Sequence, residues 1–332
     1  MNKELKYSFE AAGACEEAVK ADSSNLLYKK DDVNLRVAPS PDEKKRKSFA
    51  AKMNGWKNHP GSALISLLVW LAALLTLAIM VFLVGFIVIK GVRYLTPDLF
   101  AFTYNSENVS LMPALINTLI MTVLSLLIAI PVGVFAAIYL VEYAKKGSKL
   151  VSLLRITAET LSGIPSIIYG LFGLLFFSTA LGWGYSLLSG SLTLVIMILP
   201  VIIRTSEEAL LAVPDSYREA SFGLGAGKLR TIFKIVLPAA IPGILSGVVL
   251  STGRIVGETA ALLYTAGSVA KVPSSLMGSG RTLAVHMYVL SSEGLYMNQA
   301  FATAVVLLIF VLVLNGISDL LAKKLMNGRG EK

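Results

Sequence analysis

The sequence predicts an all-α integral membrane protein with six transmembrane helices, and three observations lead to this fold class. Of the 332 residues, 55% are hydrophobic and only 15% are charged, whereas soluble domains carry about 25% charged residues. The charges also gather at one end, since residues 1–60 hold 12 of the 30 basic and 9 of the 21 acidic residues. Six later stretches have the roughly 20 apolar residues that a membrane-spanning helix needs. These features exclude a soluble enzyme, a disulfide-built secreted domain and a disordered protein.

The first segment, residues 1–60, mixes charges with Asn, Ser and Gly and has no sustained apolar period. We expect a polar, disordered cytoplasmic extension, and the basic run Lys44–Lys47 suits a stop signal just before the membrane. The single cysteine, Cys15, lies here and excludes an internal disulfide or a cysteine-based metal cluster. No cleavable signal peptide is expected, because the first apolar run begins only near Gly61.

The six expected spans follow in order: Ala63–Ile89, Pro113–Val141, Ile156–Leu181, Leu187–Ile203, Ala239–Tyr264 and Ala300–Leu321. Proline is tolerated inside a membrane helix where neighbouring groups satisfy the freed carbonyl. Pro165 and Ser166, in the third span, are a candidate kink or gate, with a plain packing kink as the alternative. The expected organisation is an extension (1–60), a first helix and external loop (61–110), a five-helix core (111–322) and a cytoplasmic tail (323–332).

Lysine and arginine are distributed unevenly between the two sides of the expected bundle. Residues 1–60, the connectors after the second and fourth spans and the C-terminal tail hold 25 of the 30 basic residues. The opposite connectors hold four, and Arg254 falls inside a span. Positive residues favour the cytoplasmic side, so both termini are expected in the cytoplasm. The net charge of +9 is therefore a topology signal, with attraction to anionic lipid as a secondary effect, and no nucleic-acid partner is expected.

The longest cytoplasmic connector, residues 204–238, alternates short helical patterns with prolines and glycines. Ser216 and Glu219 form an S-x-x-E pattern, which predicts a capping box that opens a short helix. A short helix with exposed Tyr217 and Phe222 suits insertion into a groove on a partner protein. A plain amphipathic hairpin on the membrane surface is the alternative.

This connector resembles a motif of the permease subunits of ATP-binding-cassette (ABC) importers, which carry a cytoplasmic E-A-A-x3-G-x9-I-x-L-P loop. The fixed positions match at Glu219, Ala220, Gly225, Ile235, Leu237 and Pro238, and Ser221 replaces the second alanine. In the family this loop docks into the ATPase subunit. The resemblance therefore implies an ATPase-coupling role for these residues and a type I importer permease (MetI-like) core.

The chain itself is not expected to be an enzyme. Its glycine-rich stretch around Gly225 lacks the spacing of a phosphate-binding loop, and Leu229 follows Lys228 where Ser or Thr would be needed. With only two histidines in the sequence, no metal site is expected. ATP and Mg would thus be used by a separate ATPase, and this chain would bind no cofactor.

The fifth span contains two charged residues, Arg254 and Glu258, in the segment GRIVGETAALLYTAG. A charge near the bilayer centre costs at least about 2.5–3.5 kcal/mol on insertion scales, so it needs a partner or a function. Their i, i+4 spacing predicts one helix face, with Arg254 roughly 24 Å along the helix from Pro238. Either the pair only neutralises itself, or Arg254 meets an anion in the translocation path and Glu258 competes for the guanidinium.

Longer segments resemble the A-type permease of the high-affinity phosphate importer, the PstA family, over about residues 111–321. They are SGIPSIIYGLFGLLFF, GRIVGETAALLYTAG, TLAVHMYVLSSEG and AFATAVVLLIFVLVLN. The resemblance implies that Arg254 and Glu258 take part in phosphate transport. It further implies a bacterial or archaeal cell-membrane location, a PstC-like second permease, two copies of a PstB-like ATPase and a PstS-like extracytoplasmic phosphate-binding protein.

Two other kinds of transporter stay open. One is an importer permease for another oxyanion, such as sulfate or molybdate, or for an amino acid. The other is a secondary carrier driven by an ion gradient, with Arg254 and Glu258 as a relay. A purely structural membrane scaffold would leave the buried arginine unexplained.

Five further positions receive specific expectations. Asn117 and Thr118 are expected to cap the second span, with a place along the translocation path as the alternative. Arg155 is expected to form a local ion pair with Glu159. His286 is expected in an external connector, where it could touch the binding protein.

Overall fold

The computed structural model describes residues 60–145 and 147–327, without the side chains of Pro60, Ser62, Ala63, Leu150, Asp319 and residues 321–327. The predictions for residues 1–59, including Cys15 and Lys44–Lys47, and for the last five residues lie outside this part. The chain divides into two compact units, residues 1–78 and 79–332, and the bundle below belongs to the second.

The described chain is helical throughout its regular elements, with short π-helical turns (η2, η3, η4) extending three of the helices. The elements are α3 (Pro60–Val92), the 3₁₀ turn η1 (Pro97–Phe100), α4 (Met112–Ile138), η2 (Tyr139–Tyr143), α5 (Lys149–Ser162), α6 (Ser166–Gly173), η3 (Leu174–Ala180), α7 (Leu187–Leu211), α8 (Asp215–Gly223), α9 (Lys228–Thr231), η4 (Ile232–Val236), α10 (Leu237–Gly257), α11 (Ala260–Thr265), α12 (Leu283–Glu293) and α13 (Met297–Asn327).

Five described helices are long and apolar enough to cross a membrane, and a bent pair makes a sixth span if counted as one. The predicted fold class is therefore confirmed. The third span is wrong as a continuous helix, because α5 and α6 meet at 100°. Pro165 lacks an N–H and disfavours helical geometry at the residue before it, so the chain breaks there. The predicted kink at Pro165 and Ser166 is thus a full helix break.

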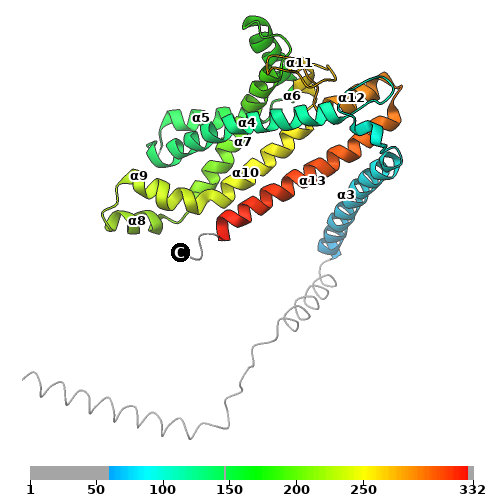
Figure 1. Ribbon diagram of the computed structural model, residues 1–332. Helices are drawn as coiled ribbons and strands as arrows, with labels where there is room; N and C mark the ends of the chain where they lie inside the picture. The colour runs from blue at the N-terminus through cyan, green and yellow to red at the C-terminus, as the bar shows by residue number, and fades with distance from the viewer. Residues whose placement is uncertain (1–59, 146, 328–332) are drawn as a thin grey trace, which may run out of the picture. The chain divides into compact units, whose positions relative to one another are not determined.

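α7 is the central helix of the bundle and packs against α4, α5 and α10 (Figure 1). Its apolar residues supply much of the main core cluster, with Leu194, Met197 and Ile198 fully buried. Met121 of α4 and Leu262 of α11 belong to the same cluster. Burial on so many sides explains why α7 is apolar around most of its circumference.

α6 and α11 approach each other closely at Gly170. A Cβ atom at this position would lie 2.8 Å from Ala261 Cα, a contact with backbone that cannot move aside cheaply. Small residues permit such close helix contacts within membranes. Gly170 therefore fixes how α6 packs against α11, the helix that follows Glu258.

We expect Gly170→Ala to destabilise the bundle by about 1–3 kcal/mol, because overpacking forces backbone shifts. The matched control is Gly85→Ala in α3, where a Cβ would meet no atom within 4 Å. Denaturant titration of the two purified variants in detergent checks this. Equal stability of both variants would contradict the tight contact.

Asn117 and Thr118 do not cap α4, which begins at Met112 without any side-chain cap. Instead, Asn117 Nδ2 donates to the backbone oxygens of Lys271 (2.9 Å) and Arg281 (3.2 Å). Thr118 Oγ1 accepts from the Leu283 N–H at 2.8 Å. Asn117 therefore ties α4 to the long connector between α11 and α12, and Thr118 ties α4 to the start of α12. The capping prediction was wrong.

His286 lies in α12 and is completely buried, so it cannot touch a binding protein directly, contrary to expectation. Its ring meets Tyr104 edge-on at 6.2 Å, and the Arg281 guanidinium stacks on the same tyrosine at 4.8 Å. Burial, together with the positive charge of Arg281, lowers the pKa of His286 from 6.5 to about 3. The imidazole is therefore neutral in the folded protein at physiological pH.

This burial makes stability dependent on pH. The unfolded chain protonates His286 below pH 6.5 and the folded chain only near pH 3, so stability falls as pH drops through this window. Between pH 6.5 and 5 the loss should approach about 2 kcal/mol. His286→Phe should remove most of it, as measured by unfolding in detergent at pH 7.5 and 5. An unchanged acid sensitivity in His286→Phe would show that other groups cause it.

Candidate functional site

The connector between α7 and α10 forms a helical hairpin, α8–α9. Gly225 turns the chain after α8 with φ +80°, a conformation that favours glycine, and its N–H donates to Phe222 O at 2.9 Å. Ser221 is buried, and its hydroxyl lies 2.8 Å from Thr231 Oγ1 on α9. The serine that departs from the E-A-A pattern therefore closes the hairpin with a hydrogen bond that alanine could not make.

The start of α8 differs from its prediction. The helix begins at Asp215, directly after Pro214, and no side chain caps its first N–H groups. Ser216 is thus inside the helix, and the predicted capping box is absent. Pro214, with its fixed φ, sets the chain direction there.

α8 and the following turn present an exposed surface. Glu219 and Ala220 are exposed, and Tyr217 and Phe222 are exposed at 52% and 47%, as expected from the sequence. Leu224 reaches 89% exposure. Exposed apolar side chains next to a carboxylate, on a short helix held by a hairpin, are typical of a protein-docking surface.

The second half of the hairpin is continuous with the fifth span. α9, η4 and α10 run without a break from Lys228 to Gly257. Ile235, Leu237 and Pro238 lie within this helix, so the span begins well before the predicted Ala239. The fourth span likewise continues past the predicted Ile203 to Leu211, which places Arg204 within α7.

Arg254 lies in the last turn of α10, at the far end of this continuous helix. Its side chain is partly exposed. Among the described residues no ion pair or hydrogen bond engages its guanidinium, and its positive charge acts electrostatically on the Tyr169 hydroxyl. Arg254 is therefore a cation without a bound carboxylate, roughly 24 Å from Pro238 along the helix.

Glu258 does not share a helix face with Arg254, because α10 ends at Gly257 and Glu258 is extended (φ −71°, ψ 128°). The Glu258 side chain is buried, and its Oε1 accepts the Ala261 N–H at 3.0 Å. It thus caps the first turn of α11, and the predicted pairing of Glu258 with Arg254 does not form here. An acceptor at the N-terminus of a helix satisfies an otherwise free N–H.

Tyr169 connects this region to the bend between α5 and α6. It is 5% exposed, and its hydroxyl donates to Leu161 O at 2.6 Å, across the helix break. The sequence analysis missed this residue, since an aromatic side chain in an apolar run carries no local sign of such a bond.

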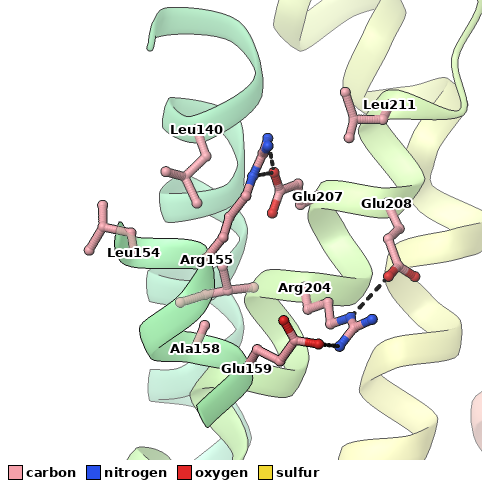
Figure 2. A pocket seen from close by; sticks show the side chains of 10 residues that line it. Leu140, Leu154, Arg155, Ala158, Glu159, Arg204, Glu207, Glu208 and Leu211 are labelled. Atoms are coloured by element: carbon pink, nitrogen blue, oxygen red, sulfur yellow. Dashed lines mark hydrogen bonds and ion pairs between the residues drawn. The ribbon is translucent and has the colours of Figure 1, made fainter. Parts of the chain in front are cut away.

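A cluster of charged side chains lies where α5 passes the C-terminal part of α7 (Figure 2). Arg155 pairs with Glu207, and Arg204 pairs with Glu208 at 3.1 Å and with Glu159 at 3.6 Å. These side chains line a cavity of about 270 Å³. The expected local pair between Arg155 and Glu159 was wrong, because each residue instead reaches across to α7. Among the described residues no group of three or more potential ligands could hold a metal ion.

Comparison with known proteins identifies the family. The pattern of the family described as "Binding-protein-dependent transport system inner membrane component" matches residues 129–327. The chain belongs to this family. It is accordingly a multi-pass membrane protein and a permease component of an ABC importer.

Two named relatives show which kinds of permease the chain is similar to. The chain is 36% identical to the probable ABC transporter permease protein YqgI of Bacillus subtilis, covering 74% of this chain and 89% of the relative. It is 42% identical to the phosphate transport system permease protein PstA 1 of Mycobacterium tuberculosis, covering 46% of this chain and 50% of the relative. The match thus spans about half the length of the mycobacterial protein. The predicted resemblance to PstA is confirmed.

Solved structures share the fold. A chain of a bacterial ABC transporter that imports the acidic polysaccharide alginate aligns with a TM-score of 0.58 and 17% identity, covering 82% of this chain and 99% of that one. A chain of the inward-facing methionine transporter MetNI aligns with a TM-score of 0.51 and 22% identity, covering 65% and 94%. At these identities the likeness concerns the fold alone.

Proposed function

We propose that this permease carries inorganic phosphate into the cytoplasm by alternating access, driven by a separate ATPase. The observation that carries the proposal is the single helix Lys228–Gly257, which joins the α8–α9 hairpin to Arg254, a residue with no ion-pair partner in the part of the chain that the structure describes. An arginine offers a planar fork of donors that matches the oxygens of an oxyanion. The similarity to PstA relatives supports phosphate as that oxyanion.

We propose that α8 is the contact for the ATPase. Its exposed Glu219, Phe222 and Leu224 would enter a groove on that subunit, and Gly225 and Ser221 would keep the hairpin rigid. ATP and Mg would be bound by the ATPase pair. A second permease subunit and an extracytoplasmic phosphate-binding protein would complete the importer, with both termini of this chain in the cytoplasm, as the distribution of basic residues favours.

In this mechanism a push on the hairpin moves the whole continuous helix. A helix transmits displacement along its axis because every backbone hydrogen bond lies within it. Movement of α8 and α9 would therefore shift Arg254 and alter the side from which an anion can reach it. The bend at Pro165, which Tyr169 ties to the Arg254 region, is the candidate gate.

Two other substrates or mechanisms make different predictions. An importer for sulfate, molybdate or an amino acid would still require the ATPase but would not transport phosphate. A carrier driven by an ion gradient would need no ATPase, and the E-A-A hairpin would then have no partner.

Uptake of radioactive phosphate, in cells whose other phosphate uptake systems are deleted, tests the proposal. We expect uptake to require the ATPase and to resist a tenfold excess of sulfate or molybdate. We also expect the tagged chain to co-purify with an ATPase. Uptake that is blocked by sulfate would contradict the proposed substrate. A chain that purifies without any ATPase would contradict the proposed energy source.

A further inference from the structure

Arg218 of α8 joins three helical elements through one guanidinium group. Its Nε and Nη2 donate to Glu142 Oε1, in the η2 turn that ends α4, at 3.0 and 2.9 Å. Its Nη2 and Nη1 also donate to the backbone oxygens of Leu210 (3.0 Å), in the last turn of α7, and Val213 (2.8 Å), in the connector that follows. A further bond, from Nη1 to Asp215 Oδ1 at 3.1 Å, stays within α8.

The contact with Glu142 is well shielded from solvent, whereas the contact with Asp215 is not. The side chains of Arg218 and Glu142 are 14% and 9% exposed, and that of Asp215 is 80% exposed. Charged hydrogen bonds gain strength in such a shielded place, and removal of one partner leaves the other charge uncompensated. Exposed pairs contribute little. Of the two carboxylates, Glu142 is therefore the one that can fix the position of α8.

The hydrogen bonds of Arg218 also satisfy backbone carbonyl oxygens at the end of α7 and just beyond it. The last carbonyls of α7 have no partner within the helix, and the guanidinium satisfies one of them, Leu210 O, together with Val213 O just beyond the helix. Arg218 is thus both a C-terminal cap for α7 and an ionic link to α4. Lysine could replace the charge but not this number of simultaneous bonds.

We propose that Arg218 is the positioning residue that couples α8 to α4 and α7, so that these three elements move as one body when the ATPase moves α8. This inference rests on the proposed function of α8 as the ATPase contact. It adds a second route into the bundle beside the continuous helix Lys228–Gly257. Arg218 acts through Glu142 and the end of α7, and it need not touch substrate or nucleotide.

The test compares two isosteric variants that each remove one carboxylate from the same guanidinium, Glu142→Gln and Asp215→Asn, in the complete importer with its ATPase. Glu142→Gln retains an acceptor oxygen and so protects folding, and Glu142→Ala removes it. The first readout is the number of phosphate ions imported per ATP hydrolysed. We expect a fall of about threefold for Glu142→Gln and of tenfold or more for Glu142→Ala and Arg218→Lys. Asp215→Asn should stay within about twofold of the parent, and all variants should retain the ATPase.

The second readout does not depend on the solute. Spin labels at Ser216→Cys on α8 and Tyr139→Cys in η2, in a Cys15→Ser background, report the distance between these two elements. When ATP is trapped in the ATPase, the parent and Asp215→Asn should keep one narrow distance distribution. Glu142→Ala should give a broadened or displaced one.

The outcomes separate this inference from the proposed function. A narrow distribution and a parental import ratio in Glu142→Ala would overturn the coupling role of Arg218. If the parent complex imports no phosphate but its labels respond to Glu142→Ala as described, the phosphate proposal fails and the Arg218 link stands. Loss of the ATPase from every Glu142 variant, with an unchanged label distance, would also overturn the link, since Arg218 would then only shape the docking surface.

Discussion

Phosphate uptake by the Arg254→Gln variant is expected to fall about 100-fold while the protein still inserts and assembles. Glutamine keeps much of the side-chain size but loses the charge and the paired donors that match an oxyanion. Removal of one partner from a desolvated charged contact costs about 2–5 kcal/mol, and each 1.4 kcal/mol is a factor of ten. Because Arg254 has no carboxylate partner in the described structure, its replacement leaves no uncompensated acid behind.

Two further variants sharpen this result. Arg254→Lys retains the charge without the fork and should recover only part of the uptake. Glu258→Gln retains an oxygen that can accept the Ala261 N–H, so it should transport better than Glu258→Ala if capping of α11 is the main role of Glu258. Normal uptake by Arg254→Gln would defeat the pathway assignment, though not the identification of the chain as a permease.

Glu219→Lys is expected to abolish coupling to the ATPase. Glu219 is exposed on α8, so the substitution should leave the fold of the hairpin intact, since the bonds of Ser221 and Gly225 that close it are unaffected. Reversal of charge at a protein interface places like charges together or leaves a partner cation unpaired, and this costs several kcal/mol. We expect uptake to fall at least tenfold, with the ATPase either lost on purification or hydrolysing ATP without transport.

The matched control is Glu208→Lys, which reverses an exposed carboxylate on α7 outside the hairpin. It should retain the ATPase, because its pair with Arg204 is exposed and contributes little to stability. A Glu219→Lys importer that transports normally and keeps its ATPase would refute the docking role of α8.

Local sequence patterns predicted the structure correctly where a single type of residue decides the backbone geometry. Runs of about 20 apolar residues located the membrane helices, and Pro165 marked the helix break. The glycine of the E-A-A pattern fell at the one position in the hairpin that needs a positive φ, Gly225. These features depend on the residue itself or on its immediate neighbours, so a single sequence carries them.

Patterns failed where the partner lies on another element. Spacing of i, i+4 suggested that Arg155 would meet Glu159 and Arg254 would meet Glu258. In the structure, Arg155 reaches Glu207 on α7, and Glu258 bonds to the backbone of α11. The i, i+4 spacing indicates which side chains are neighbours within one helix. It says nothing about contacts with other helices, and it holds only if the helix continues through both residues. Nothing in the sequence indicated that α10 ends at Gly257, because an apolar run follows and membrane helices and buried loops have similar composition.

The central claim, that this permease serves an ATP-driven importer of phosphate, is tested most directly in proteoliposomes that contain the assembled complex. ATP is supplied on the side that carries α8, and phosphate with its binding protein on the other. The account predicts phosphate accumulation on the ATP side, dependent on ATP hydrolysis and unchanged when ion gradients are collapsed. Accumulation without ATP that follows an imposed ion gradient, or ATP hydrolysis without any phosphate movement, would contradict it.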